Sequence, residues 1–352
     1  IAKPTISAEA GILYDVTNGR VLFEKNADEK LAPASTTKLM TALLVLEKAN
    51  LDDKVTFSKT AVTNLESGAV KIGLVEGDQV SVTDSLYALL LKSANEVANG
   101  LAEHVSGSIS AFAELMNARA AELGCTNTHF VNPNGLNSDQ QYTTCRDMAK
   151  IAAAAFANKT LCEIDSTLSY KFPATKAAAA RTITPGHKML YPNDSRYYAG
   201  IVGGKTGYTS KAGNTLVSCV EKNGVRMVAV ILKSKSTHYE DTKKMLDYGY
   251  QYVNTEKSGS TSAGKQTTAG HWVQDNGSWR YEFAAGTKAV GTIYTIDAAD
   301  FGFDTDGKMV TGWKMFGTEW HYFETNGKMV KSAWRQDSGK WFYLDAEGKI
   351  AK

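Results

Sequence analysis

Apolar, β-favouring runs on either side of an Asn-Gly dipeptide predict β-hairpins at two distant places in the chain. Asn-Gly favours the tight turn that joins two antiparallel strands. The strands are expected over residues 11–16 and 20–25 around Asn18-Gly19, and over 215–220 and 225–232 around Asn223-Gly224.

Between these hairpins, apolar residues recur at helical spacing. Residues 109–123 and 85–105 are expected to be helical, and so is 36–49. Helices in the middle with hairpins at both ends predict an antiparallel sheet that is built from the two ends of the domain and covered by helices. The apolar positions of the first predicted helix are Leu39, Met40, Leu43, Leu44 and Leu46.

The pattern changes near residue 255. The stretch 255–270 is rich in Ser, Thr and Gly and has no apolar periodicity, which is typical of a flexible linker. All six tryptophans lie beyond it. We therefore expect a domain over 1–254, a flexible linker over 255–269 and a second domain over 270–352.

The second domain is repetitive. Trp313 and Trp334 are 21 residues apart, as are Trp320 and Trp341. Aromatic pairs before turns such as T-N-G-K predict short hairpins, and a period near 20 residues predicts that they stack and bury each other's faces. The unit over 292–311 is degenerate, because it has no tryptophan.

Composition and charge narrow the class of protein. The chain has 352 residues, a net charge of +2 and no run of like charges, so no nucleic-acid partner is expected. No apolar segment reaches the roughly 18 to 20 residues of a transmembrane helix. The chain starts at Ile1 without a signal peptide, as a mature secreted protein does, although a trimmed chain would start in the same way.

The cysteines argue against a metal or redox motif. Cys125, Cys145, Cys162 and Cys219 form no C-x-x-C pair, and we expect neither a metal nor a cofactor. Cys219 lies in an apolar run and is expected to pack as a small hydrophobic residue. Cys125 and Cys145 could form a disulfide, but spacing does not determine pairing.

The first candidate for chemistry is P-A-S-T-T-K at 33–38. Ser35 and Lys38 are three residues apart at the start of a predicted helix, so their side chains share a face. A lysine amine can accept the serine proton if burial or nearby positive charge lowers its pKa. The helix N-terminus would stabilise developing negative charge. An N-cap serine followed by a surface lysine is the alternative.

The second candidate is S-A-N at 93–95, which interrupts a helical run. In a loop, the side chains of Ser93 and Asn95 can point side by side into a cleft. Ser93 would relay a proton beside Lys38, and Asn95 would hold a substrate amide. The alternative is a helix break with local side-chain capping.

The third candidate is G-G-K-T-G-Y-T at 203–209. Glycines around a Lys-Thr pair at a strand allow a ligand to approach the backbone closely. Lys205 offers a charge and Thr206 a hydroxyl to a carboxylate. A phosphate-binding loop is rejected, because the motif lacks the G-x-x-x-x-G-K-[ST] order and precedes a strand.

In this order, S-x-x-K, S-x-N and K-T-G resemble the signature of penicillin-binding proteins and serine β-lactamases. Residues 5–254 are similar to the low-molecular-mass D-Ala-D-Ala carboxypeptidases. The resemblance implies an α/β (α+β) fold class with a DD-peptidase-like antiparallel sheet flanked by helices. The stretches that carry it are P-A-S-T-T-K-L-M-T-A (33–42), L-L-L-K-S-A-N-E-V-A (89–98), F-V-N-P-N-G-L (130–136) and G-G-K-T-G-Y-T (203–209).

The resemblance also implies a mechanism. Ser35 would attack the carbonyl between the two terminal D-alanines of a peptidoglycan stem peptide, and β-lactam antibiotics would acylate it. Lys38 would be the general base, and Ser93 would pass the proton to the leaving D-alanine. The other implied site residues are Asn95 and Lys205, with substrate-binding Thr206, Gly207, Tyr208 and Thr209; the N–H groups of Ser35 and Tyr208 would form the oxyanion hole.

Other functions stay open on the same residues. A DD-transpeptidase or endopeptidase would use the same motifs. A β-lactamase ranks lower, because no motif for a dedicated deacylating acid is found in the sequence. Outside the enzymes, the alternative is an inactive wall-binding protein that has kept the fold.

Residues 270–352 resemble the cell-wall or choline-binding repeats of Gram-positive surface proteins. In such repeats, aromatic side chains form a cage for a quaternary ammonium through cation–π attraction. The resemblance implies choline or another wall polymer as partner, and a secreted protein at the cell wall or cell surface of a Gram-positive-type bacterium. The alternative is that the aromatics only fill the hairpin core. The candidate cage residues are Trp313, Trp320, Tyr322, Trp334, Trp341 and Tyr343.

Overall fold

The computed structural model describes residues 2–63, 65–263, 270–275, 277–284, 286–297, 299–317, 319–337 and 339–350, with side chains in the same ranges except 256–263. The chain divides into two compact units, Ile1–Tyr250 and Gln251–Lys352. The boundaries that the sequence predicts, at 254 and 270, remain a prediction for the functional domains.

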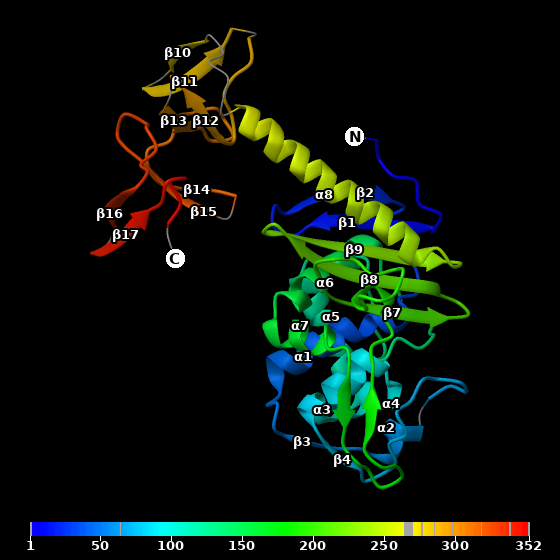
Figure 1. Cartoon of the computed structure of the whole chain (residues 1–352). Coiled ribbons are helices and arrows are strands. Elements are labelled where there is room, and N and C mark those ends of the chain that lie inside the picture. Colours follow the sequence, from blue (N-terminus) through cyan, green and yellow to red (C-terminus); the bar gives the residue numbers. More distant parts are fainter. Residues whose placement is uncertain are drawn as a thin grey trace. The chain divides into compact units, whose positions relative to one another are not determined.

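A five-stranded antiparallel sheet forms the centre of the first unit, in the order β2-β1-β9-β8-β7 (Figure 1). Strand β1 pairs with β9, so the two ends of the unit meet inside the sheet, as predicted. Both Asn-Gly turns join neighbouring strands, and Asn223 and Gly224 have φ of 52° and 72°, the left-handed values that such a turn requires. The strands are β1 (Ala10–Asp15), β2 (Arg20–Lys25), β7 (Ile201–Thr209), β8 (Gly213–Lys222) and β9 (Val225–Ser234).

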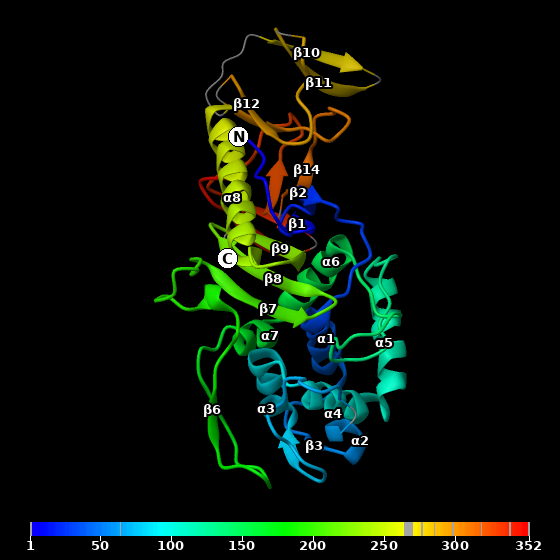
Figure 2. The ribbon, with the colours of Figure 1, turned by 90° about the vertical axis from the view of Figure 1, so that its right-hand side faces the viewer.

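Helix α8 lies on one side of the sheet, and the other helices lie on the opposite side and extend away from it (Figure 2). The predicted helices are present, and the run over 85–105 is interrupted at 93–94, as the S-A-N motif predicts. The helices are α1 (Lys38–Lys48), α2 (Lys59–Thr63), α3 (Val82–Tyr87), α4 (Asn95–Ser106), α5 (Ile109–Glu122), α6 (Cys145–Phe156), α7 (Lys159–Asp165) and α8 (His238–Ala263). The short 3-10 helices are η1 (Ala34–Thr37) and η3 (Lys188–Leu190), and η2 (Ala88–Lys92) is a π-helix that continues α3. Two small hairpins are β3 (Lys54–Thr56) with β4 (Gln79–Ser81), and β5 (Tyr170–Phe172) with β6 (Arg181–Ile183).

The two faces of the sheet bury alternate residues of each strand. On one face, Ile12 and Val228 belong to the main core, and helix α6 contacts β1, β8 and β9 there. On the other face, a Cβ at Gly249 of α8 would lie 2.5 Å from Leu13 Cδ2 and 2.7 Å from Met227 Sδ. Glycine at this position therefore allows α8 to lie closely on the sheet.

Helix α8 corrects part of the linker prediction. It extends through Ala263, so residues 255–263 are helical where their composition predicts a flexible linker. Adding a residue to a formed helix costs far less than starting one, and the packed first turns of α8 supply the start. Residues 264–269 lie outside the described residues.

The second unit contains four two-stranded antiparallel hairpins, as the repeat predicts. The degenerate unit forms a hairpin too, and its Phe303 is fully buried, as are Phe323 and Leu344 at matching positions of the next two units. The degenerate unit therefore keeps this core position without a tryptophan, and its Ile296 and Phe301 are buried as well. The hairpins are β10 (Gly270–Asp275) with β11 (Ser278–Phe283), β12 (Ile293–Ile296) with β13 (Ala299–Gly302), β14 (Gly312–Phe316) with β15 (Glu319–Phe323), and β16 (Ala333–Asp337) with β17 (Lys340–Leu344).

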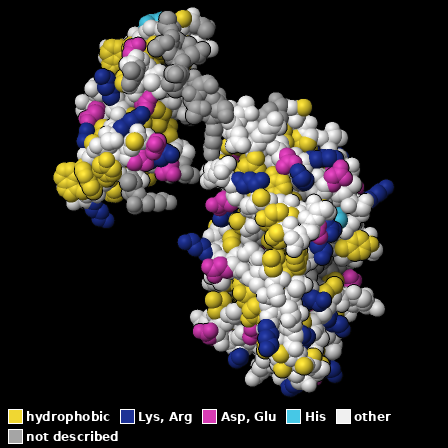
Figure 3. All heavy atoms as spheres, viewed as in Figure 1, with side chains coloured by type: hydrophobic (Ala, Val, Ile, Leu, Met, Phe, Trp, Pro, Cys, Tyr) yellow, Lys and Arg dark blue, Asp and Glu magenta, His cyan; other side chains and the backbone are white. Residues whose placement is uncertain are grey.

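All four cysteines are free thiols, so Cys125 and Cys145 are not paired, and Cys219 is buried as predicted. Positive and negative side chains are intermixed over the visible face of the molecule, in line with the small net charge (Figure 3). Within the described ranges, no helix has the length and apolar character needed to cross a bilayer.

Candidate active site and repeat pockets

The S-x-x-K and S-x-N motifs meet at the amine of Lys38, the first residue of α1. Lys38 Nζ lies 3.0 Å from Ser35 Oγ, and it donates to Asn95 Oδ1 at 2.8 Å and to the carbonyl oxygen of Asn134 at 2.6 Å. The side chain of Lys38 is fully buried. Lys38 is therefore not the surface lysine that the sequence also allowed, but a buried lysine in contact with the Ser35 hydroxyl.

The backbone around the serine is strained. Ala34 has φ of 49° and Ser93 has φ of 61°, a left-handed conformation that is uncommon for residues other than glycine. The surrounding structure holds Ala34 tightly, because a Cβ at Gly135 would lie only 1.9 Å from its carbonyl oxygen. Strain of this kind persists where packing over-determines it and is concentrated at functional sites.

Edge strand β7 brings the K-T-G motif to the serine. A Cβ at Gly207 would lie 2.8 Å from the backbone nitrogen of Ser35 and 2.3 Å from Thr215 Oγ1, so only glycine permits this approach. Lys205 is buried, and its Nζ donates to the carbonyl oxygen of Thr206 at 2.8 Å. The result is a strand edge that runs directly past the nucleophile candidate.

The electrostatics of the site favour a neutral Lys38. Burial lowers the pKa of Lys38 well below its ordinary value, and the positive charge of Lys205 lowers it further, whereas Glu96 acts in the opposite direction. Burial also lowers the pKa of Lys205 to about 8, against the charge of Asp165. The direction of the Lys38 shift is the one that the sequence argument requires.

A pocket of about 390 Å³ lies in front of Ser35. Of the predicted residues, Ser35, Asn95, Tyr208 and Thr209 line it. Lys38 and Lys205 are buried, and Ser93 is half-buried. Thr206 and Gly207 lie on β7 but do not line this pocket. The remaining lining residues are Glu66, Ser67, Gly68, Ala69, Val70, Gly135, Leu136, Asn137 and Ser210.

Sequence reasoning missed several residues that hold the site together. The Asn134 carbonyl binds Lys38, and the Asn134 amide donates to Asn99 Oδ1 at 2.9 Å. The stretch 130–136 carries the family resemblance, but nothing in its letters indicates contact with Lys38. Glu96, buried directly after S-A-N, was detectable as a charged residue within an apolar helix.

Asp165 is a second residue without a sequence signal. It is buried, and its Oδ2 accepts from the backbone N–H of Gly204 at 2.6 Å, one residue before Lys205. Burial raises the pKa of Asp165 to about 7, although the Gly204 hydrogen bond and the charge of Lys205 act against it. Asp165 thus fixes β7 and places a titratable acid beside Lys205.

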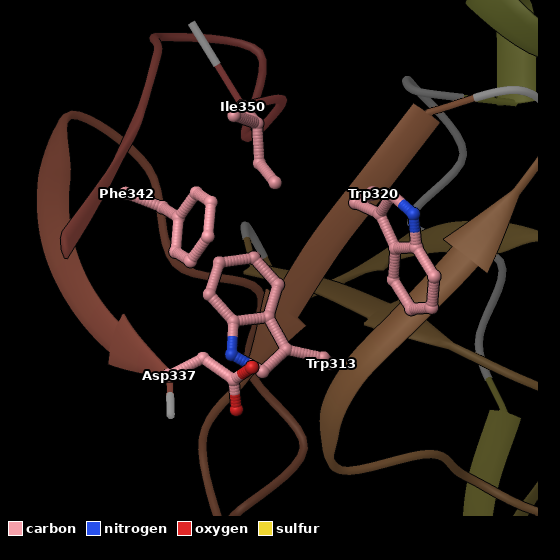
Figure 4. Close-up of a pocket in the computed structure, with 5 residues that line it drawn as sticks. All are labelled: Trp313, Trp320, Asp337, Phe342 and Ile350. Atoms are coloured by element: carbon pink, nitrogen blue, oxygen red, sulfur yellow. The ribbon is translucent and has the colours of Figure 1, made fainter. Parts of the chain in front are cut away.

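In the second unit, a pocket of about 260 Å³ opens between neighbouring hairpins (Figure 4). The rings of Trp313 and Trp320 stand on opposite sides, and Phe342 and Ile350 close another side. Asp337 also lines the pocket and brings a carboxylate to it. An aromatic enclosure with one carboxylate suits a cation.

A second pocket, of about 370 Å³, repeats this arrangement 41 residues earlier in the chain. Trp272, Trp279, Phe301 and Met309 take the places of Trp313, Trp320, Phe342 and Ile350. The other described residues that line the earlier pocket are the neutral Thr325 and Asn326. The two pockets therefore share their rings and differ in charge.

The six predicted cage residues do not share one pocket. Trp313 and Trp320 line the pocket of Figure 4, and Tyr322 packs against Trp313 with ring centroids 5.2 Å apart. Tyr343 packs on Trp334 in the same way, at 5.3 Å. Trp334, Trp341 and Tyr343 line neither described pocket. The sequence did not single out Phe342, because it treated only tryptophan and tyrosine as cage residues.

A buried lysine on a serine, an S-x-N turn and a K-T-G strand edge are together the arrangement shared by penicillin-binding proteins and serine β-lactamases. A family model described as D-alanyl-D-alanine carboxypeptidase matches residues 1–236. The chain belongs to this family. A model described as choline-binding repeat matches residues 289–334 and 310–352.

Similar proteins agree with this assignment. The chain is 34% identical over 269 residues to D-alanyl-D-alanine carboxypeptidase DacC of Escherichia coli, covering 72% of this chain and 64% of that protein. It is 34% identical over 258 residues to DacF of Bacillus subtilis, covering 70% and 63%. The chain thus spans slightly under two thirds of these relatives. The crystal structure of the Streptomyces K15 DD-transpeptidase superposes with a TM-score of 0.65 at 32% identity, covering 71% of this chain and all of that one.

Proposed function

We propose that this protein is a serine-type D-Ala-D-Ala carboxypeptidase that removes the terminal D-alanine from peptidoglycan stem peptides through an acyl-enzyme on Ser35. The observation that carries the proposal is the set of three contacts made by Lys38 Nζ. Membership of the family and the names of the relatives support the substrate.

The contacts of Lys38 suit a general base. A neutral amine has two N–H groups and one lone pair, and the oxygens of Asn95 and Asn134 can accept only N–H groups. The remaining contact, at 3.0 Å, is the Ser35 hydroxyl, which can donate its proton to the lone pair. Burial holds the pKa of Lys38 low, so the amine is neutral near pH 7 more often than an exposed lysine. Lys38 would then take the proton as Ser35 attacks.

The other residues take the roles that the resemblance implies. The N–H groups of Ser35 and Tyr208 would bind the oxyanion, and the close passage of Gly207 supports their convergence. Asn95 would hold the substrate amide, and Ser93 would pass the proton to the departing D-alanine. Lys205 would contribute positive charge, and Thr206 would bind the terminal carboxylate. Gly207 and Thr209 would contact the substrate along the strand edge.

The decisive experiment combines D-alanine release from a stem peptide with labelling by a fluorescent penicillin. The wild-type protein should do both, and Ser35→Ala should abolish both. Ser67→Ala is a matched control, because Ser67 lines the same pocket without contacting Lys38. If the wild-type protein takes no label and releases no D-alanine, it is an inactive wall-binding protein and the proposal is wrong.

A DD-transpeptidase is the second candidate function, because a solved structure of that name has a similar fold over 71% of this chain. Adding an amine acceptor to the stem-peptide assay distinguishes the two. Transfer of the acyl group to the acceptor would favour the transpeptidase, and release of the free acid would favour the carboxypeptidase. An endopeptidase would instead cut cross-linked peptides, and rapid turnover of penicillin would indicate a β-lactamase.

We further propose that the repeat unit holds the enzyme at a choline-bearing or similar polymer of the Gram-positive-type cell wall after secretion. The two aromatic pockets support a quaternary ammonium ligand, and the choline-binding repeat match supports choline. The full chain should bind a choline resin and elute with free choline. Failure to bind both this resin and purified wall material would overturn the proposal.

A further inference from the structure

The pocket in front of Ser35 has apolar patches among polar side chains, and one of its lining side chains is charged. Tyr208 is 66% exposed and Val70 is 48% exposed, so both present apolar surface to the pocket that they line, together with half-buried Leu136. Glu66 is the one charged side chain among the described residues that line the pocket. Such a site favours a ligand group with an aliphatic stem and a positive end.

The carboxylate of Glu66 is available to a ligand. Within the described part of the chain, no hydrogen bond or ion pair of this side chain is observed, and the side chain is exposed. Lys211, which follows the lining residue Ser210, forms an ion pair with Asp139 at 2.5 Å. A cation that enters the pocket therefore meets a carboxylate that has no hydrogen-bond or ion-pair partner among the described residues.

The segment that carries Glu66 is held against the catalytic residues. Val70 O accepts from the backbone N–H of Asn95 at 2.9 Å and from its Nδ2 at 3.0 Å. Glu96 Oε1 accepts from the N–H groups of Ile72 and Gly73 at 2.7 and 2.9 Å. Because Asn95 also binds Lys38, the position of this segment is fixed relative to the nucleophile.

The pocket lies on one side of Ser35 only. Asn95 and the end of β7 at Thr209 line it, whereas Thr206, the residue proposed for the terminal carboxylate, does not. The departing D-alanine belongs on the Thr206 side, so the pocket is left for the part of the acyl donor that precedes the scissile bond.

From these contacts we infer that Glu66 is a specificity-determining residue, which binds a terminal ammonium on a long aliphatic side chain of the acyl donor. The side chain belongs to the residue before the penultimate D-alanine, and its stem packs on Tyr208, Val70 and Leu136. The inference rests on the proposed function, because it assumes that a peptide ending in D-Ala-D-Ala acylates Ser35.

Two substrates that differ only in charge test it: Nα-acetyl-L-lysyl-D-alanyl-D-alanine and its Nα,Nε-diacetyl form. The wild-type protein should show about a five-fold higher kcat/KM for the free ammonium, the size expected of one partly exposed ion pair. Glu66→Gln should remove this preference, so that the variant acts on the two peptides with similar kcat/KM. Glu76→Gln is the matched control, because Glu76 is also exposed but does not line the pocket.

The outcomes separate the two proposals. Equal rates for both peptides with the wild-type protein, or a preference that survives in Glu66→Gln, would overturn the role of Glu66 while leaving the carboxypeptidase intact. Release from neither peptide would instead contradict the proposed function. Penicillin labelling of Glu66→Gln at the wild-type rate shows that the variant is folded, so a lost preference then reports on charge.

Discussion

The catalytic unit and the repeat unit present their functional side chains in opposite ways. Around Ser35, each polar group occurs once, and the titratable side chains of Lys38, Lys205 and Asp165 are buried. In the repeat unit, the binding groups are aromatic rings that occur twice, and Trp279 and Trp320 are each more than two fifths exposed.

The difference follows from desolvation. A buried charge is tolerated only when its partners are in place, so removing one partner from the catalytic site affects all the others. An exposed aromatic ring contributes to ligand binding independently of other groups. When it is removed from one pocket, the equivalent ring of the second pocket remains. Single substitutions should therefore give all-or-none effects in the first unit and graded effects in the second.

The largest effect is expected from Lys38→Met. The variant has an unbranched side chain slightly shorter than that of lysine and no nitrogen lone pair for the Ser35 proton, so kcat for D-alanine release should fall by about 10²- to 10⁴-fold. Lys48→Met, at the exposed end of the same helix, should have no effect. A wild-type rate in Lys38→Met would show that another group activates Ser35.

The next effect concerns pH. A base must be neutral, so kcat/KM should rise as pH increases through the lowered pKa of Lys38. The charge of Lys205 is lost as pH increases through its pKa of about 8, so above that value the rate should fall by about ten-fold per pH unit. Asp165→Asn removes the charge that raises this pKa and should move the alkaline fall to lower pH. An unchanged pH profile would exclude Lys205 as the group responsible.

A smaller effect is expected from single rings of the repeat unit. Trp320→Ala opens the pocket of Figure 4 and should weaken choline binding there about ten-fold, the size of a well-formed cation–π contact. Trp334→Ala removes a more exposed ring that lines neither described pocket, and should change little. Titration of the full chain followed by tryptophan fluorescence measures both, and the reverse order of effects would refute the pocket assignment.

The smallest effect should distinguish the two pockets from each other. Asp337→Asn removes the carboxylate of one pocket and should weaken cation binding there only about two- to three-fold, because the side chain is exposed. The difference from wild type should shrink at high salt, since salt screens an exposed charge. The measurement is made in a Trp272→Ala variant, in which binding at the other pocket is weakened. A loss of affinity that persists in 1 M salt would contradict an electrostatic role of Asp337.

Much of the fold was predictable because its signals are local. The Asn-Gly turns require left-handed residues, and the structure has hairpins at both places. The S-A-N break also depends on adjacent residues. The helical structure of residues 255–263 was not predicted, because their composition alone does not show that they continue the helix that begins at His238.

The site was predictable in its motifs but not in its supports. Ser35, Lys38 and Asn95 come together as the motif order predicts. The carbonyl of Asn134 contacts Lys38, 96 positions away, and the carboxylate of Asp165 contacts Gly204, 39 positions away. A single sequence does not show which distant residues come into contact. Strain at Ala34 is likewise a product of packing against Gly135.

The 41-residue offset between the two aromatic pockets has a consequence for anchoring. A polymer that repeats its cationic group can occupy both pockets of one chain, and the second capture is then intramolecular. The resulting avidity multiplies two modest affinities without any new contact. Free choline competes with each pocket separately, so the enzyme would stay on the wall for long periods and still be released by a soluble ligand at high concentration.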